Sequence, residues 1–188
     1  MHSLNTTVFA AINGLAEKSY YVDRAFVWVT TYLIYALFVG VIAYLFYDAY
    51  RKRHLPLQEL HAIARSIYVT ISVAIAWFVV WMLKVALVIP RPGHTLPSVN
   101  VLTNATGSSF PSGHAALSMA IATALFVYHP KIGKYAIMLA LAIGVSRVYV
   151  GVHYPLDIVV GWAIGYLVPL WLHSVFSRGI GSAVNSPQ

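Results

Sequence analysis

The sequence contains no cysteine and very few acidic residues. Disulfide bonds and thiolate metal sites are therefore excluded. Asp and Glu account for 5 of the 188 residues, and the one acidic residue beyond Glu59 is Asp157. A hard divalent cation needs several oxygen ligands, so no magnesium or calcium site is expected. Zinc is not expected either, because Lys and Arg lie beside the candidate histidine ligands and would repel the metal. The sequence therefore predicts no metal and no cofactor.

Charge of either sign is scarce, and apolar residues dominate. Charged residues make up 9% of the chain, against roughly 25% in soluble domains. A helix that crosses a bilayer needs about 20 mostly apolar residues. The segments that meet or approach this length are Phe26–Tyr47, Ser66–Pro90, His114–Tyr128, Tyr135–Val150 and Ile158–Phe176. We expect an all-α, multi-pass membrane helical bundle with five spans.

The chain is expected to form one domain over residues 1–188, since no internal repeat is visible. Residues 1–24 lack the basic start and continuous apolar core of a signal peptide. Phe9, Ile12, Leu15 and Ala16 share one helical face, which predicts a short helix lying at the membrane interface. Insertion of this segment as a sixth span is the alternative. Residues 179–188 are small and polar and are expected to be disordered.

The net charge of +7 is concentrated near the ends of the expected spans. This placement favours contact with membrane lipids over binding of nucleic acid. The basic residues that fall on one side of a five-span chain are Arg51, Lys52, Arg53, Arg65, Lys131, Lys134 and Arg178. Basic loops are retained in the cytoplasm, so the opposite side faces the outside or the periplasm of a bacterial inner membrane.

Three clusters of polar residues fall on that external side. The first cluster consists of Lys84 and Arg91, whose spacing of two helical turns predicts a shared face at the end of the second span. Pro90 and Pro92 should then break the helix.

The second cluster consists of Ser112, Gly113 and His114 at the start of the third span. Ser112 is expected to cap the helix, with His114 in its first turn. A helix N-terminus presents free N–H groups and positive partial charge, which suits a phosphate. Gly113 would let the backbone approach such an anion closely.

The third cluster consists of Arg147, His153 and Asp157. Pro155 is expected to be the first residue of the last helix, which places Asp157 in its first turn. The carboxylate could then hold the His153 imidazole N–H and fix its tautomer. An arginine at mid-depth in a membrane costs about 2.5 kcal/mol or more, so Arg147 suggests a functional role.

Together the clusters predict metal-free phosphoryl transfer. Three cations can neutralise a dianionic phosphoryl group, and two histidines offer a nucleophile and a proton donor. A transporter or flippase is an alternative from another class. It would spread charges through the membrane depth, whereas these charges gather at one end and the first span has none.

The three clusters, in this order and spacing, resemble the signature of the type 2 phosphatidic acid phosphatase superfamily. The resemblance implies that His153 is the nucleophile that forms a phosphohistidine and that Asp157 orients it. His114 would protonate the leaving oxygen and later activate water. The residues implied to bind phosphate are Lys84, Arg91, Ser112, Gly113 and Arg147, so the catalytic clusters extend over residues 84–157.

The small size and short N-terminal segment are most similar to the bacitracin-resistance type of bacterial undecaprenyl pyrophosphate phosphatases. This resemblance implies a lipid pyrophosphate substrate, hydrolysed at the external membrane face to undecaprenyl phosphate for cell-wall synthesis. Phosphatidic acid and phosphatidylglycerophosphate remain alternative substrates. The sequence makes no prediction of the oligomeric state.

Overall fold

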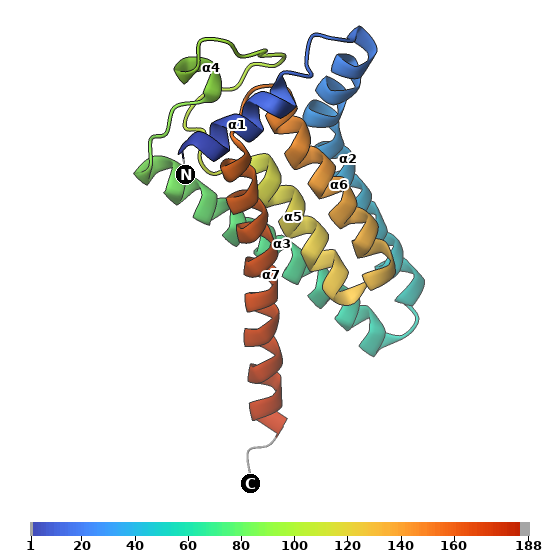
Figure 1. Cartoon of the computed structure of the whole chain (residues 1–188). Coiled ribbons are helices and arrows are strands. Elements are labelled where there is room, and N and C mark those ends of the chain that lie inside the picture. The colour runs from blue at the N-terminus through green and yellow to red at the C-terminus, as the bar shows by residue number, and fades with distance from the viewer. Residues whose placement is uncertain (1, 185–188) are drawn as a thin grey trace.

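The structure, a computed structural model, describes residues 2–184, and all regular structure in that range is helical. The helices are α1 (His2–Asn13), α2 (Tyr20–Lys52), α3 (Pro56–Ala86), α4 (Pro92–Thr95), α5 (Gly113–Tyr128), α6 (Pro130–Tyr149) and α7 (Pro155–Val184). Five of them, α2, α3, α5, α6 and α7, form a bundle, and α1 and α4 lie at one end of it (Figure 1). The expected all-α bundle is confirmed.

Four helices are long and apolar enough to cross a membrane: Tyr20–Lys52, Glu59–Ala86, Pro130–Tyr149 and Pro155–Ser177. The fifth, α5, has 16 residues, about 24 Å of helix, against a hydrocarbon core about 30 Å thick. Residues 115–125 of α5 are buried apart from Leu117, because the helix packs against α3, α6 and α7. A central helix covered by its neighbours meets little lipid and does not have to match the bilayer thickness.

Glycines allow α7 to pack closely on α5. A Cβ atom at Gly161 would lie 2.7 Å from the carbonyl oxygen of Ser112, and one at Gly165 would lie 2.2 Å from that of Ala116. Small residues spaced four apart let two membrane helices approach backbone to backbone. This contact places the start of α5 beside the start of α7 and so brings the second and third clusters together.

The N-terminal helix lies across the ends of α6 and α7 (Figure 1). With 12 residues, α1 is too short to span a bilayer. Phe9 and Ala16 are buried against the bundle, whereas Leu15 is 55% exposed. Leu15 departs from the expected face because the helix ends at Asn13 and the chain turns there. The Asn13 side chain fixes α1 by donating to the carbonyl oxygens of Asn100 and Tyr149.

One expectation about a helix end is wrong. The third helix ends at Ala86, so Arg91 does not share a helical face with Lys84. Proline disfavours helical backbone in the residue before it, so Pro90 prevents the helix from continuing through Ile89. At the other end of the chain, α7 continues to Val184 and so includes residues 179–184 of the segment expected to be disordered, an expectation that stays a prediction. Helix growth adds one hydrogen bond per residue. Pro169 lies inside α7 without ending it, and no further proline follows before Pro187. Residues 185–188 lie outside the described range.

Candidate active site

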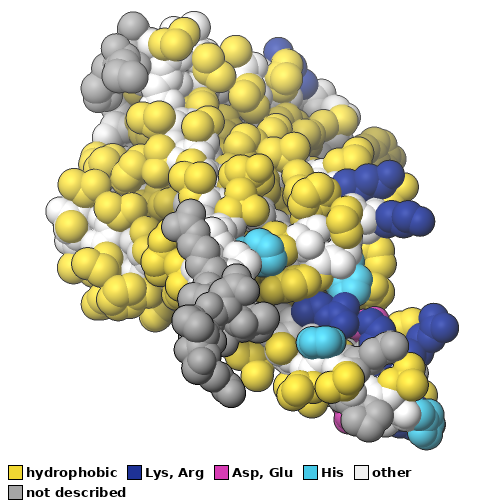
Figure 2. Space-filling view, turned by 90° about the horizontal axis from the view of Figure 1, so that it is seen from below, with side chains coloured by type: hydrophobic (Ala, Val, Ile, Leu, Met, Phe, Trp, Pro, Cys, Tyr) yellow, Lys and Arg dark blue, Asp and Glu magenta, His cyan; other side chains and the backbone are white. Residues whose placement is uncertain are grey.

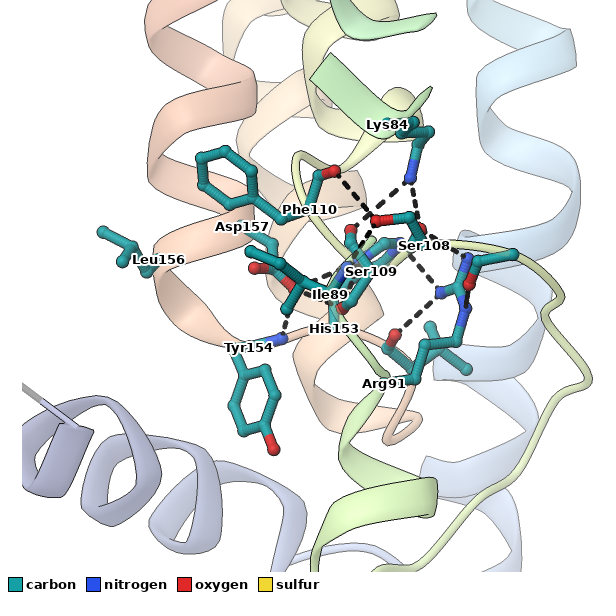
Figure 3. Close-up of polar contacts among 12 residues, drawn as sticks. Lys84, Ile89, Arg91, Ser108, Ser109, Phe110, His153, Tyr154, Leu156 and Asp157 are labelled. Carbon is teal, nitrogen blue, oxygen red and sulfur yellow. Dashed lines mark hydrogen bonds and ion pairs between the residues drawn. The ribbon is translucent and has the colours of Figure 1, made fainter. Parts of the chain in front are cut away.

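The first cluster is assembled by an extended segment rather than by a helix. Residues 87–91 run beside residues 108–109. The Ser109 N–H donates to the Ile89 carbonyl oxygen at 2.8 Å. The Ser108 hydroxyl donates to the Leu87 carbonyl oxygen, also at 2.8 Å. Lys84, at the end of α3, donates through Nζ to the Ser108 carbonyl oxygen at 2.5 Å (Figure 3). The Arg91 Nη2 atom lies 3.5 Å from the same oxygen. Lys84 and Arg91 therefore meet as predicted, but by a different route.

Most of the hydrogen-bonding capacity of Arg91 is used by the protein itself. Its guanidinium donates to the carbonyl oxygens of Thr106 at 2.8 Å, Gly107 at 3.1 Å and Val152 at 2.8 Å. Arg91 is 8% exposed. It therefore joins the loop before α5 to the segment that carries His153, and it adds a positive charge beside that histidine.

The third cluster has the predicted geometry. His153 lies just before α7, which begins at Pro155, and its Nδ1 atom is 3.4 Å from Oδ2 of Asp157. The same carboxylate oxygen accepts from the Tyr154 N–H at 2.9 Å and from the Ser109 hydroxyl at 2.5 Å (Figure 3). Asp157 is 3% exposed and His153 is 2% exposed. The carboxylate is thus held by three donors out of contact with bulk water.

The hydrogen bonds determine the tautomer of His153. Nη1 of Arg91 lies 3.3 Å from Nε2 of His153. A guanidinium nitrogen can only donate, so Nε2 must be the acceptor and the imidazole proton must sit on Nδ1, facing Asp157. Burial lowers the pKa of His153 to about 4; the nearby charges of Arg147 and Arg91 act in the same direction, and the hydrogen bond to Asp157 opposes them. Nε2 is therefore an unprotonated nitrogen at neutral pH.

We expect His153 to stay neutral between pH 8 and pH 5, a range in which an ordinary histidine with a pKa of about 6.5 takes up its proton. An unfolded chain would bind that proton below about pH 6.5, so acid should also lower the free energy of unfolding. Nitrogen NMR of ¹⁵N-histidine-labelled protein in detergent tests the protonation state, with the signal assigned by its loss in His153→Asn. A His153 titration midpoint above pH 6 would contradict this prediction.

The second cluster opens α5 as predicted. Ser112 is the N-cap, α5 begins at Gly113, and His114 lies in the first turn. The Ser112 hydroxyl makes no cap bond, is buried, and has no hydrogen-bond partner among the described residues. Apart from its chain neighbours and its own helix, the one described residue within 4 Å of a Cβ atom at Gly113 would be Val80, at 3.9 Å, so other elements do not fill this space. A buried, unpartnered hydroxyl beside an uncrowded helix N-terminus suits an anion.

Arg147 completes the group from the last turn of α6. It is 7% exposed, and its Nη1 atom donates to the Thr30 hydroxyl of α2 at 2.8 Å. Its Nε atom is buried and has no partner within the described part of the chain. His114 lies within electrostatic range of Arg147, His153, Arg91 and Lys84. All three clusters therefore converge at one end of the bundle.

The charges in this group match a phosphate dianion. Lys84, Arg91 and Arg147 carry three positive charges and Asp157 carries one negative charge, which leaves a formal net charge of +2 before His114 and His153 are counted. Charge-assisted hydrogen bonds from such groups are about twice as strong as neutral ones.

Two polar residues of the site were missed by sequence reasoning. Ser109 precedes the second cluster by three residues, and its position in a serine-containing loop gave no sign of a contact with Asp157. Thr30 lies in the first span, 117 residues from Arg147. One feature of the sequence could have indicated Thr30. It is a polar residue on the same helical face as Leu37, Val41 and Leu45, the face that α2 buries.

The chain is similar over most of its length to two bacterial proteins and to one solved structure. It is 30% identical over 171 residues to undecaprenyl-diphosphatase BcrC of Bacillus subtilis, covering 87% of this chain and 82% of that protein. It is 29% identical over 170 residues to the protein called bacitracin transport permease protein BcrC of Bacillus licheniformis, covering 90% of this chain and 79% of that protein. The crystal structure of LpxE from Aquifex aeolicus superposes with a TM-score of 0.73 at 30% identity, covering 91% of this chain and 95% of that one.

The sequence model of the PAP2 superfamily matches residues 65–180, a range that contains all three clusters. The resemblance carried by their residues and spacing is thereby confirmed, and the chain belongs to the PAP2 superfamily of membrane phosphatases.

Proposed function

We propose that this protein is a lipid phosphatase that hydrolyses undecaprenyl pyrophosphate to undecaprenyl phosphate and inorganic phosphate. The observation that carries the proposal is the buried pair of His153 and Asp157, facing a group of three cations at one end of a membrane bundle. The similarity to an undecaprenyl-diphosphatase over 87% of the chain supports this substrate.

The proposed reaction begins with attack of the His153 Nε2 atom on the terminal phosphorus. The bond from phosphorus to the bridging oxygen breaks, and protonated His114 gives its proton to that oxygen. His114 then takes a proton from water, which attacks the phosphohistidine and releases inorganic phosphate. Asp157 holds the Nδ1 proton throughout and offsets the positive charge of the phosphorylated ring.

Phosphate binding is assigned to the five residues implied by the sequence, which contribute to it in different ways. The unpartnered Nε atom of Arg147 and the hydroxyl of Ser112 are free to donate to phosphate oxygens. Gly113 leaves room for an oxygen at the helix N-terminus. Lys84 and Arg91 already donate to loop carbonyls, so their charges act over a longer distance.

Two hollows beside the site support an amphipathic substrate. An apolar hollow of about 380 Å³ adjoins Asp157 and is lined by Asn5, Leu87, Ile89, Phe110, Tyr154 and Leu156. In Figure 3, Phe110 and Leu156 lie on the opposite side of Asp157 from Arg91. A more polar hollow of about 600 Å³ adjoins Arg91 and includes His94, Asn104 and Thr106. A lipid chain fits the first environment, and a hydrated headgroup fits the second.

Phosphate release from pure lipids in detergent tests the substrate. We expect undecaprenyl pyrophosphate to give a kcat/KM at least tenfold above phosphatidic acid and phosphatidylglycerophosphate. Activity should persist in EDTA, because no group of three or more His, Asp or Glu side chains in the described range is placed to hold a metal. Preference for another lipid would reassign the substrate, and activity lost in EDTA and restored by a divalent metal would overturn the metal-free mechanism.

The location of the site on the external face is also a proposal. The described basic residues Arg51, Lys52, Arg53, Arg65, Lys131 and Lys134 lie at or near the bundle end opposite the site. Figure 2 views that end and shows Lys and Arg side chains gathered on one side of it. Basic loops are retained in the cytoplasm, which supports an outward-facing site in a bacterial inner membrane.

The cysteine-free sequence allows a direct test of this orientation. Single cysteines at the exposed positions Ser98, on the site end, and Lys131, on the basic end, can be labelled in intact cells. We expect a membrane-impermeant maleimide to label Ser98→Cys and to leave Lys131→Cys unlabelled until the cells are lysed. The reverse pattern would place the active site in the cytoplasm.

A further inference from the structure

We propose that Thr30, in the first spanning helix, is a positioning residue that holds the guanidinium of Arg147 in the orientation needed to bind phosphate. This inference rests on the proposed phosphatase function. Thr30 lies outside residues 65–180, the range that carries the family signature.

Arg147 depends on Thr30 in a way that the other two cations do not. Lys84 and Arg91 are held by backbone carbonyls of the loop before α5. The one hydrogen bond of the Arg147 side chain within the described residues is the 2.8 Å contact from Nη1 to the Thr30 hydroxyl oxygen. An arginine side chain has many rotamers, so a fixed partner on one edge determines where its other N–H groups point. Here the remaining edge includes the unpartnered Nε atom.

The burial of Thr30 favours this role over a chance contact. Thr30 is fully buried on the same face of α2 as Leu37, Val41 and Leu45. It is the one polar residue among the buried residues of α2. Burying a hydroxyl in a spanning helix costs little free energy when its oxygen accepts a hydrogen bond from a charged group.

Other contacts fix α2 against α6 without Thr30. The rings of Phe26 and Tyr149 stack with centroids 3.8 Å apart. The Tyr149 hydroxyl also donates to Asp23 at 2.8 Å. The two helices should therefore stay packed when the Thr30 hydroxyl is removed, so a Thr30 variant can report on the site rather than on folding.

Thr30→Val removes the hydroxyl and keeps the shape. We expect the inhibition constant for orthovanadate, a phosphate analogue, to rise about tenfold or more and kcat/KM to fall by a similar factor, because a hydrogen bond to a charged group is lost. The vanadate-induced rise in melting temperature should shrink in parallel, which measures binding without turnover. Thr30→Ser, which restores the acceptor oxygen, should recover most of the affinity.

Thr123→Val is the matched control. Thr123 is also fully buried in a helix of the bundle, but its hydroxyl has no partner among the described residues. This variant should keep the parent inhibition constant and kcat/KM. In an Arg147→Lys background, Thr30→Val should change the inhibition constant and kcat/KM by less than twofold. The effects of substituting two residues that act through one interaction are not additive.

The outcomes separate this inference from the proposed function. A parent protein that releases no phosphate from any lipid overturns the proposed function. An active parent with an unchanged inhibition constant in Thr30→Val overturns the role of Thr30, and so does full additivity with Arg147→Lys. A lower melting temperature with unchanged vanadate affinity would show that Thr30 serves packing alone.

Discussion

Replacing His153 by alanine should lower phosphate release from lipid pyrophosphate by roughly 10⁴-fold or more, because the variant loses the nucleophile itself. Nε2 is the ring nitrogen without a proton, and no other described histidine is paired with a carboxylate. The binding cations remain in place, so orthovanadate should still raise the melting temperature. Initial rates of phosphate release, with the thermal shift measured on the same preparation, test both expectations.

His61→Ala is the control for this variant. His61 is exposed on α3, far along the helix from Lys84, and should be replaceable without loss of activity. Rapid acid-free quenching with ³²P-labelled substrate should also trap a labelled protein in the parent and none in His153→Ala. A His153→Ala protein that works within tenfold of the parent would rule out a phosphohistidine at this position.

Asp157→Asn should lower kcat by roughly 10³-fold while the protein stays folded. The amide oxygen can replace Oδ2 as the acceptor for Ser109, Tyr154 and His153, so the geometry of the site can persist. The negative charge is lost, however. The phosphorylated ring that forms during the proposed reaction then has no counter-charge, and the hydrogen bond that fixes the tautomer is weaker.

Single-turnover kinetics and a melting curve distinguish this effect from unfolding. Asp48→Asn provides the control: Asp48 pairs with Lys52 and Arg65 near the opposite end of the bundle, so its loss should affect stability without slowing the chemical step. Normal kcat in Asp157→Asn would mean that the carboxylate only caps α7.

Local sequence patterns predicted the third cluster well. Pro155 begins α7, and one helical turn then brings Asp157 to His153, a contact within five residues of chain. The prediction that Lys84 and Arg91 share a helical face was wrong. It assumed that the helix continues to Arg91, whereas α3 ends at Ala86. The two cations meet because residues 87–91 pair with residues 108–109, and that pairing leaves no periodic signal in the sequence.

The sequence by itself determined the membrane class, the five apolar helices and the convergence of three clusters at one end. These properties can be read along the chain. The length of each apolar segment and the positions of helix-breaking prolines are local, and counting the spans tells which loops share a membrane face. The tertiary structure alone decided how the polar groups are held. Ser109 reaches Asp157 across 48 residues and Thr30 reaches Arg147 across 117, because the close packing of α7 on α5 and of α2 on α6 brings them together.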